Sequence, residues 1–339
     1  MALTAIEDVR AAAPEAEVTL VVGSWNAGLA QAIPGLSRVE VLDADWLARE
    51  GGGLGLARLL GAARAWRRRG YDLAINFEPD VRSNLLLAAS GAAWAAGYGS
   101  GGGGALLDLA LEYDVGAHTS DNARRLVAAA FDRHPGGAAI GRLTIPADAA
   151  RAAAHRLPRA GRVLVGIHVS GGRAIKQWPV ERFAEIGRRL ISETDALVVL
   201  TGSAADRPLV DRLADLLPAP RVIDVAGDPD LLSTAALLQR LDLLLTADTG
   251  PMHLASAVGT PVVAIFGPSD PVRYAPRGAR DRVVRVDLAC APCNRIRRPP
   301  ARCVGRTPEC LAGVTTDIVW QAVAAALDES RQRPPSRAQ

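Results

Sequence analysis

The sequence has few cysteines and no apolar run long enough to cross a membrane. Its four cysteines all lie between Cys290 and Cys310, so no disulfide framework spans the 339 residues. A membrane-spanning helix needs about 20 consecutive apolar residues, and no run approaches that length. The start, MALTAIEDVR, lacks the charged and then apolar pattern of a signal peptide, so we expect a cytoplasmic protein.

The chain also lacks a large charge excess and the common nucleotide-binding motifs. A net charge of +3 is too small to indicate nucleic-acid binding. The basic stretches Arg67–Arg69 and Arg295–Arg298 fit a solvated surface, with peripheral membrane contact as the alternative. The G-K-[ST] order of a Walker loop is absent, and no G-x-G-x-x-G opens a helix in the expected place. These absences count against a P-loop protein and a dinucleotide-dependent enzyme.

What is present is an alternation of apolar strands and helices in both halves of the chain. This alternation predicts two doubly wound α/β domains. The expected strands are Glu17–Gly23, Val39–Leu42, Tyr71–Phe77 and Ala95–Tyr98 in the first half, and Val163–His168, Ala196–Leu200, Val222–Asp224, Leu241–Thr246 and Pro261–Phe266 in the second.

The alternation is interrupted over Leu143–Pro158, which contains Pro146, an Ala- and Arg-rich stretch and Pro158. We therefore expect an N-terminal domain over residues 1–146, a linker over 147–161 and a C-terminal domain over 162–313. A final amphipathic helix over 314–328 and a disordered tail over 329–339 complete the predicted organisation.

A strand-to-helix turn in the second half carries a polar group of residues. Asp248, Thr249 and Gly250 follow an apolar strand, Pro251 suits the start of a helix, and His253 falls in its first turn. Such turns lie at the carboxyl edge of a parallel sheet, where free N–H groups and the helix dipole favour phosphate. The alternative is that Asp248 and Thr249 only cap the helix and His253 is a packed core residue.

A second polar loop follows the strand that ends at His168. Its sequence, GIHVSGGRAIKQWPVERF, brings Ser170, two glycines and Lys176 before a helix. Backbone N–H groups, hydroxyls and an ammonium together can hold a diphosphate.

Together the two loops resemble glycosyltransferase family 9, the lipopolysaccharide heptosyltransferases. The matching residues are Lys176-x-Trp178-Pro179 and Asp248-Thr249-Gly250-x-x-His253-x-Ala255-x-Ala257, followed by Pro261, Phe266-Gly267 and Asp270-Pro271. The resemblance runs from about Met1 to Val323. It implies a GT-B architecture, with two Rossmann-like domains facing a cleft and the nucleotide sugar held mainly by the second.

The resemblance also implies site residues and partners. It assigns the donor site, usually for ADP-heptose, to Ser170, Lys176, Asp248, Thr249, Gly250 and His253. Asp206 matches an acidic position that contacts the nucleoside ribose, although an Asp before a helix also serves as a cap. We expect a monomer that acts on a glycan or lipid-linked acceptor, with acceptor contacts from loops such as Glu78–Ser83 and Gly97–Gly104.

Metal chemistry is not expected. Inverting transfer needs a base for the acceptor hydroxyl and positive charge for the departing diphosphate, which Lys176 and helix N–H groups can supply. Two Asp-x-Asp pairs, Asp43/Asp45 and Asp228/Asp230, fit surface caps better than metal ligands. A zinc or iron–sulfur site is the alternative to reduced thiols for the cysteines, which are Cys290, Cys293, Cys303 and Cys310.

The chain departs from the family at its start. Family members begin with an apolar strand and a Gly-Asp loop whose Asp is the expected base. Residues 1–13 resemble the remainder of the helix after that loop, and Glu7 and Asp8 do not match it. We therefore expect the base to lie upstream of Met1, no catalytic residue in this chain to be assignable, and the absent strand to border Glu17–Gly23 and Tyr71–Phe77.

Two other functions stay open on this evidence. Without the base the chain would be a nucleotide-sugar-binding protein that does not turn over. A nucleotide-dependent epimerase or dehydrogenase is the second alternative, and the missing dinucleotide motif counts against it.

Overall fold

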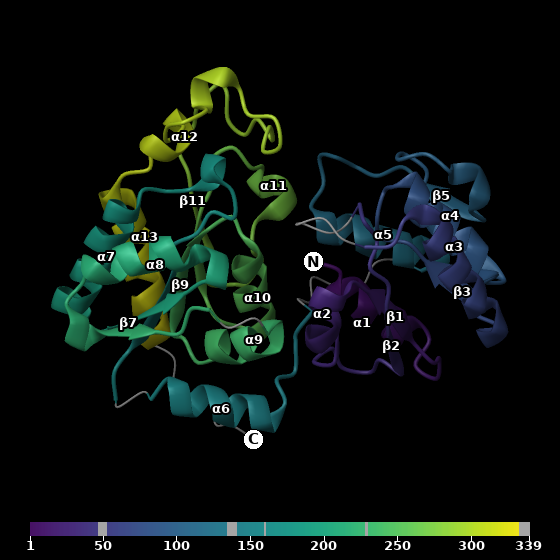
Figure 1. Ribbon diagram of the computed structural model, residues 1–339, viewed down its shortest axis with the longest axis horizontal. Coiled ribbons are helices and arrows are strands. Elements are labelled where there is room, and N and C mark those ends of the chain that lie inside the picture. The colour runs from purple at the N-terminus through teal and green to yellow at the C-terminus, as the bar shows by residue number, and fades with distance from the viewer. Residues whose placement is uncertain (47–52, 134–140, 159–160, 228–229, 332–339) are drawn as a thin grey trace. The chain divides into compact units, whose positions relative to one another are not determined.

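The computed structural model describes residues 1–46, 53–133, 141–158, 161–227 and 230–331 (Figure 1). Within it the chain divides into two compact units, Met1–Arg142 and Leu143–Gln339. The sequence-based boundary was placed at residue 146, four residues further along. Each unit is an α/β unit built on parallel strands.

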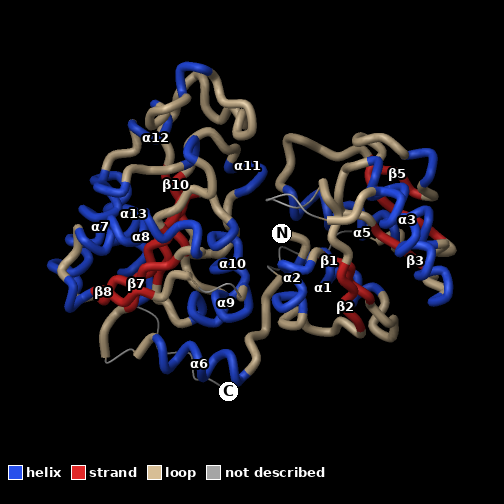
Figure 2. The backbone as a smooth tube through the Cα atoms, viewed as in Figure 1, coloured by secondary structure: helices blue, strands red, loops and turns tan. Residues whose placement is uncertain are grey.

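The second unit is built on a single six-stranded parallel sheet (Figure 2). Every residue of β6, β7, β9 and β10 is buried, as expected for apolar strands covered on both faces. In the order β11-β10-β9-β6-β7-β8, the strands are Arg282–Val284, Val262–Ile265, Leu243–Ala247, Leu164–His168, Leu197–Thr201 and Val222–Asp224.

Helices cover both faces of this sheet. Helices α7, α8 and α13 pack on one face, and α9 and α10 pack on the other (Figure 1). The helices of the unit are α6 (Ala147–Arg156), α7 (Val180–Thr194), α8 (Arg207–Asp215), α9 (Leu231–Gln239), α10 (Gly250–Val258), α11 (Pro271–Tyr274), α12 (Glu309–Ala312) and α13 (Thr316–Arg331).

Two segments differ from their sequence-based description. The expected linker contains α6, which packs on α9 and belongs to the second unit. It is held there because Ala153 and Leu157 are buried and Arg240 donates a hydrogen bond to the Leu157 carbonyl (3.0 Å). Helix α13 continues through residue 331 into the expected tail, where Glu329 pairs with Arg282. The rest of that tail lies outside the described residues.

The first unit contains two separate parallel sheets. One joins β1 (Thr19–Val22) to β2 (Arg38–Val41), and the other has the order β3-β4-β5, with Leu73–Ile75, Trp94–Tyr98 and Leu109–Leu111. Across the described residues, no strand pairing joins β1 to β3. The helices are α1 (Leu3–Ala12), α2 (Ser24–Ala30), α3 (Leu56–Ala65), α4 (Val81–Ser90) and α5 (Thr119–Ala130).

Packing between α1 and α5 ties the start of the chain to the second of these sheets. Ala5 on α1 and Val127 on α5 are buried together, with Ile75 and Phe77 of the β3 region against them. An ion pair between Arg124 and Asp8 (2.7 Å) lies beside this contact and is mostly shielded from solvent. The first unit thus holds together largely through helices.

Candidate functional site

The polar loops of the second unit meet at the carboxyl edge of its sheet. Strand β6 lies between β9 and β7 in the sheet. After β6 the chain adds β7 and β8 on one side, and it then crosses over to add β9, β10 and β11 on the other side. Open α/β sheets bind ligands at such a switch point, outside the carboxyl ends of the strands. The loops after β6, β7 and β9 carry the candidate residues Ser170, Lys176, Asp206, Asp248 and Thr249.

Lys176 and Asp248 are in direct contact although 72 positions separate them. The Lys176 ammonium donates a hydrogen bond to the Asp248 carbonyl and forms an ion pair with its carboxylate (3.1 Å). The two side chains are only 18% and 12% exposed. Lys176 is the sole lysine among the 39 lysine and arginine residues of the chain. The compact ammonium of lysine suits this confined position, whereas the guanidinium of arginine is planar and larger.

The residues beside Lys176 explain how its position is held. Trp178 is fully buried, packs edge-on against Phe183 with ring centroids 4.8 Å apart, and donates to the Val314 carbonyl (3.0 Å). The Gln177 side chain accepts from the Gly171 N–H (2.8 Å) and donates to the Trp178 carbonyl (2.9 Å). A Cβ at Gly171 would lie 2.6 Å from the Lys176 carbonyl, so only glycine permits this close fold of the loop.

The start of α10 is open for an anion. Thr249 is the N-cap, but its hydroxyl bonds to Thr246 (3.1 Å) and to the Ala247 carbonyl (3.3 Å) and makes no capping hydrogen bond to the helix. Gly250 is the first helical residue, and a Cβ there would meet nothing within 4 Å. First-turn N–H groups and the helix dipole therefore face accessible space beside Lys176. His253 lies half-buried on the same helix.

A hydrogen-bonded group lies at the ends of β6 and β7. Asp206 accepts from the Ser203 backbone N–H (2.8 Å) and hydroxyl (2.7 Å), and also from Ser170. Burial acts to raise the pKa of Asp206, but these hydrogen bonds and nearby His168 outweigh it, so the pKa is lowered. Asp206 thus completes a capping box at Ser203 as well as facing the Ser170 loop.

His168 was not among the candidate residues predicted from the sequence. It is buried at the end of β6 and its Nδ1 lies 3.2 Å from the Thr201 hydroxyl. Burial lowers the pKa of His168 to about 4, against a smaller opposing effect of Asp206. The imidazole is therefore neutral at neutral pH and serves as a hydrogen-bonding group. A polar residue that ends an apolar strand just before Ser170 is the signal that could have identified it.

In the first unit, two loops at the carboxyl ends of β3 and β4 are locked together. Asn84 is fully buried and donates to the carbonyls of Tyr98 and Gly102 (both 2.9 Å), while it accepts from the Asn76 side chain (2.7 Å). A Cβ at Gly101 would lie 2.0 Å from the Pro79 carbonyl, which shows how closely the two loops approach. These loops are Glu78–Ser83 and Gly97–Gly104, the expected acceptor loops.

One aspartate of each acidic pair, Asp43 and Asp230, accepts from backbone N–H groups at the start of a helix. Asp43 accepts from the Ser24 N–H (2.7 Å) at the start of α2, and Asp230 caps α9 through the Ser233 N–H (2.9 Å). Asp228 lies outside the described residues. Throughout the described part of the chain, no three His, Cys, Asp or Glu side chains stand close enough together to hold a metal ion.

Two α/β units with parallel sheets, and a polar loop cluster at the carboxyl edge of the second, define a GT-B protein. The model of the family described as "Glycosyltransferase family 9 (heptosyltransferase)" matches residues 60–301 of the chain. The chain therefore belongs to glycosyltransferase family 9 and is a transferase, and the predicted family is confirmed.

Individual relatives agree with this assignment. The lipopolysaccharide core heptosyltransferase OpsX of Haemophilus influenzae is 25% identical over 291 residues, which cover 84% of this chain and 80% of that protein. The glycosyltransferase family 9 structure from Veillonella parvula superposes with a TM-score of 0.80 at 22% identity, covering 97% and 93% of the two chains. For the ADP-heptose heptosyltransferase II of E. coli the TM-score is 0.78 at 19% identity, covering 97% and 95%. These superpositions confirm the GT-B fold.

Among the helices of the described residues, none combines the length and the apolar character needed to span a bilayer.

Proposed function

We propose that this protein transfers a heptose or a related sugar, with inversion, from a nucleotide-sugar donor, ADP-heptose, to a glycan or lipopolysaccharide-type acceptor. The observation that carries the proposal is the contact between Lys176 and Asp248 beside the uncapped start of α10. Family membership and relatives described as lipopolysaccharide heptosyltransferases support the substrate class.

Each donor-site residue has a role in this proposal. The Lys176 ammonium and the first N–H groups of α10 would stabilise the charge that develops on the departing diphosphate, so no metal is required for transfer. Thr249, Gly250 and His253 would line the same edge, with Gly250 allowing the phosphate to approach the backbone. Ser170 and Asp206 would bind the nucleoside, with the Asp206 carboxylate accepting from a ribose hydroxyl.

The acceptor would meet the first unit at the loops that Asn84 holds together. A lipid-linked acceptor would also bring the protein to a membrane surface, and Arg295, Arg297 and Arg298 are exposed and suited to peripheral contact with anionic headgroups. Four free thiols suit a reducing compartment such as the cytoplasm.

Calorimetry with ADP tests the donor site. Lys176→Ala should weaken binding by about 1.5–3 kcal/mol, or about 10- to 150-fold, because a charge-assisted hydrogen bond is lost. Lys176→Arg should restore little of this, since the site confines the ammonium. Arg188→Ala, which removes the same charge from an exposed position on α7, is the matched control and should bind as the wild type does.

A chelator added to the wild type should leave ADP affinity unchanged. Strict Mg²⁺ dependence, or equal affinity in wild type and Lys176→Ala, would contradict the proposed donor site. Because Lys176 is the sole lysine, labelling by an amine-selective reagent, read apart from labelling of the N-terminal amine, reports on it: ADP should protect its side chain from labelling. Transfer itself is measured as ADP release from ADP-heptose that depends on a lipopolysaccharide-type acceptor.

A further inference from the structure

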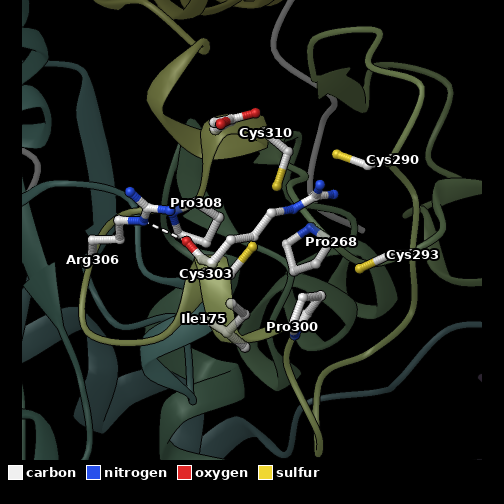
Figure 3. A pocket seen from close by; sticks show the side chains of 11 residues that line it. Ile175, Pro268, Cys290, Cys293, Pro300, Cys303, Arg306, Pro308 and Cys310 are labelled. Atoms are coloured by element: carbon white, nitrogen blue, oxygen red, sulfur yellow. Dashed lines mark hydrogen bonds between the residues drawn. The ribbon is translucent and has the colours of Figure 1, made fainter.

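All four cysteines of the chain line one small cavity of about 40 Å³ in the second unit. Their sulfur atoms face this space (Figure 3). The residues come from three segments: Cys290 and Cys293 follow β11, Cys303 ends the short helical turn Ala301–Cys303, and Cys310 lies in α12. The fold thus gathers every thiol of a 339-residue chain at one place.

The surroundings of the thiols suit a bound cation. The cavity has room for a single ion, since even a water molecule needs only about 10–15 Å³ of such space. Ile175, Pro268, Pro300 and Pro308 contribute apolar walls, whereas Cys290 is exposed at the edge of the cavity. Cys290 and Cys293 have the Cys-x-x-Cys spacing that places two thiolates on one metal.

A positively charged side chain, Arg302, lies beside two of the thiols. Four thiolates and one divalent cation together carry a net charge of −2. The Arg302 guanidinium donates to Cys303 and lies within electrostatic range of Cys290, so it would offset this charge. The Arg306 side chain in turn donates to the Arg302 carbonyl. Hydrogen bonds of this kind orient thiolate ligands and tune a metal site.

From these observations we propose that Cys290, Cys293, Cys303 and Cys310 bind a thiophilic divalent metal, zinc or ferrous iron, in a tetrahedral four-thiolate site. As the side chains stand, no three of them are at ligand spacing. Metal binding would therefore require a change of side-chain rotamer at some of the cysteines, each of which has one side-chain torsion with three staggered positions. A metal would hold them at about 2.3 Å and displace the thiol protons.

The role of this site would be to brace the donor loops. Ile175, which lines the cavity, directly precedes Lys176. Asn294, next to Cys293, donates through its backbone N–H to the Pro268 carbonyl (2.8 Å) and accepts from the Asp270 N–H (2.9 Å). A metal that fixes the cysteine loop would thus stiffen both the Lys176 loop and the turn after β10. It would take no part in the transfer chemistry.

Metal analysis of the whole protein tests the proposal without any assay of transfer. Protein produced without a metal-binding tag, in medium supplemented with zinc or with iron, should contain about one metal ion per chain. The element found distinguishes the two metals. A mercurial reagent should release the metal to a chromophoric chelator, and cobalt substitution should give intense thiolate-to-metal absorption. A metal-free protein whose four thiols all react with a disulfide reagent would overturn the proposal.

Substitutions test whether the cysteines, rather than acidic side chains elsewhere in the chain, bind the metal. Cys290→Ser with Cys293→Ser should abolish metal content and speed amide hydrogen exchange at Ile175 and Lys176. Asp43→Asn with Asp230→Asn is the control and should retain the metal. If the cysteine variant fails to fold, the metal content and mercurial release of the wild type still decide the question. Loss of ADP binding with the metal retained would contradict the proposed function and leave this site intact.

Discussion

The two units of this protein bury their strands to very different extents. In the second unit, four neighbouring strands are buried at every residue, and one sheet runs through the whole unit. In the first, β1 and β3 have no fully buried residue and lie in separate sheets, and Val21 on β1 is 40% exposed. Because apolar stabilisation grows with the area removed from water, the second unit should be the more stable.

The more complete burial of the strands in the second unit explains why the charged residues of the candidate donor site are attached there. Lys176, Asp248 and Asp206 are attached to the ends of fully buried strands or to loops anchored in the same core, as Trp178 anchors Lys176. A diphosphate site needs groups fixed within fractions of an ångström, and rigid elements provide this better than loops alone. The first unit instead fixes its loops with a local amide, Asn84, and its strands β1, β2 and β3 have no fully buried residue.

The largest expected effect comes from removing the anchor of the second unit. Trp178→Ala should lower the free energy of unfolding of that unit by about 3–5 kcal/mol, because it leaves a large cavity in the core. Trp94→Ala in the first unit is the matched control and should cost less, since Trp94 is 37% exposed and Trp178 is fully buried. Urea unfolding followed by hydrogen exchange of each unit measures both. Equal losses would remove the distinction between the units.

The pH dependence of stability should also separate the units. The pKa of His168 is about 4 when folded and near 6.5 when unfolded, so the unfolded chain binds the proton more readily between these values. The stabilisation from neutral His168 is fully present above about pH 6.5. It falls by about 3 kcal/mol as the pH drops to about 4. Urea midpoints of the second unit across this range should show the slope.

His168→Gln is the control for that slope. The variant has no titrating group at this position, so its second unit should lose less stability between pH 6.5 and pH 4, whatever its stability at neutral pH. An identical slope in wild type and variant would show that another group is responsible.

The smallest expected effect comes from a matched pair of substitutions on strands. Val198→Thr on the buried β7 should cost about 1–3 kcal/mol, because it buries a hydroxyl in an apolar layer. Val21→Thr on β1 should stay within about 0.5 kcal/mol, since its side chain already meets solvent. Thermal or urea unfolding of the two variants gives both values. A larger loss at Val21 would show that β1 is covered more completely in solution than its exposure indicates.

Several elements could be predicted because their signals are local. The unit β9–α10–β10 is two apolar runs separated by Asp-Thr-Gly-Pro, and each boundary is set by turn or capping residues within a few positions. The short strands β5 and β11 and the helix α2 were not predicted, because three to seven residues carry too little periodicity. The sequence of α6 was interpreted as a linker because an Ala- and Arg-rich stretch between Pro146 and Pro158 interrupts the alternation of strands and helices. Its packing on α9 shows that it belongs to the second unit.

The sequence by itself determined the family and the alternation of apolar strands with helices, because both are written in neighbouring residues. It also placed Lys176 and Asp248 after parallel strands, which share one edge of a sheet. Only the tertiary structure decided which groups touch there: the Lys176 ammonium on the Asp248 carbonyl, His168 beside Thr201 and Asp206, Asn84 across two loops, and four cysteines around one cavity. These contacts join residues far apart in the chain, and their distances depend on how whole elements pack rather than on any local preference.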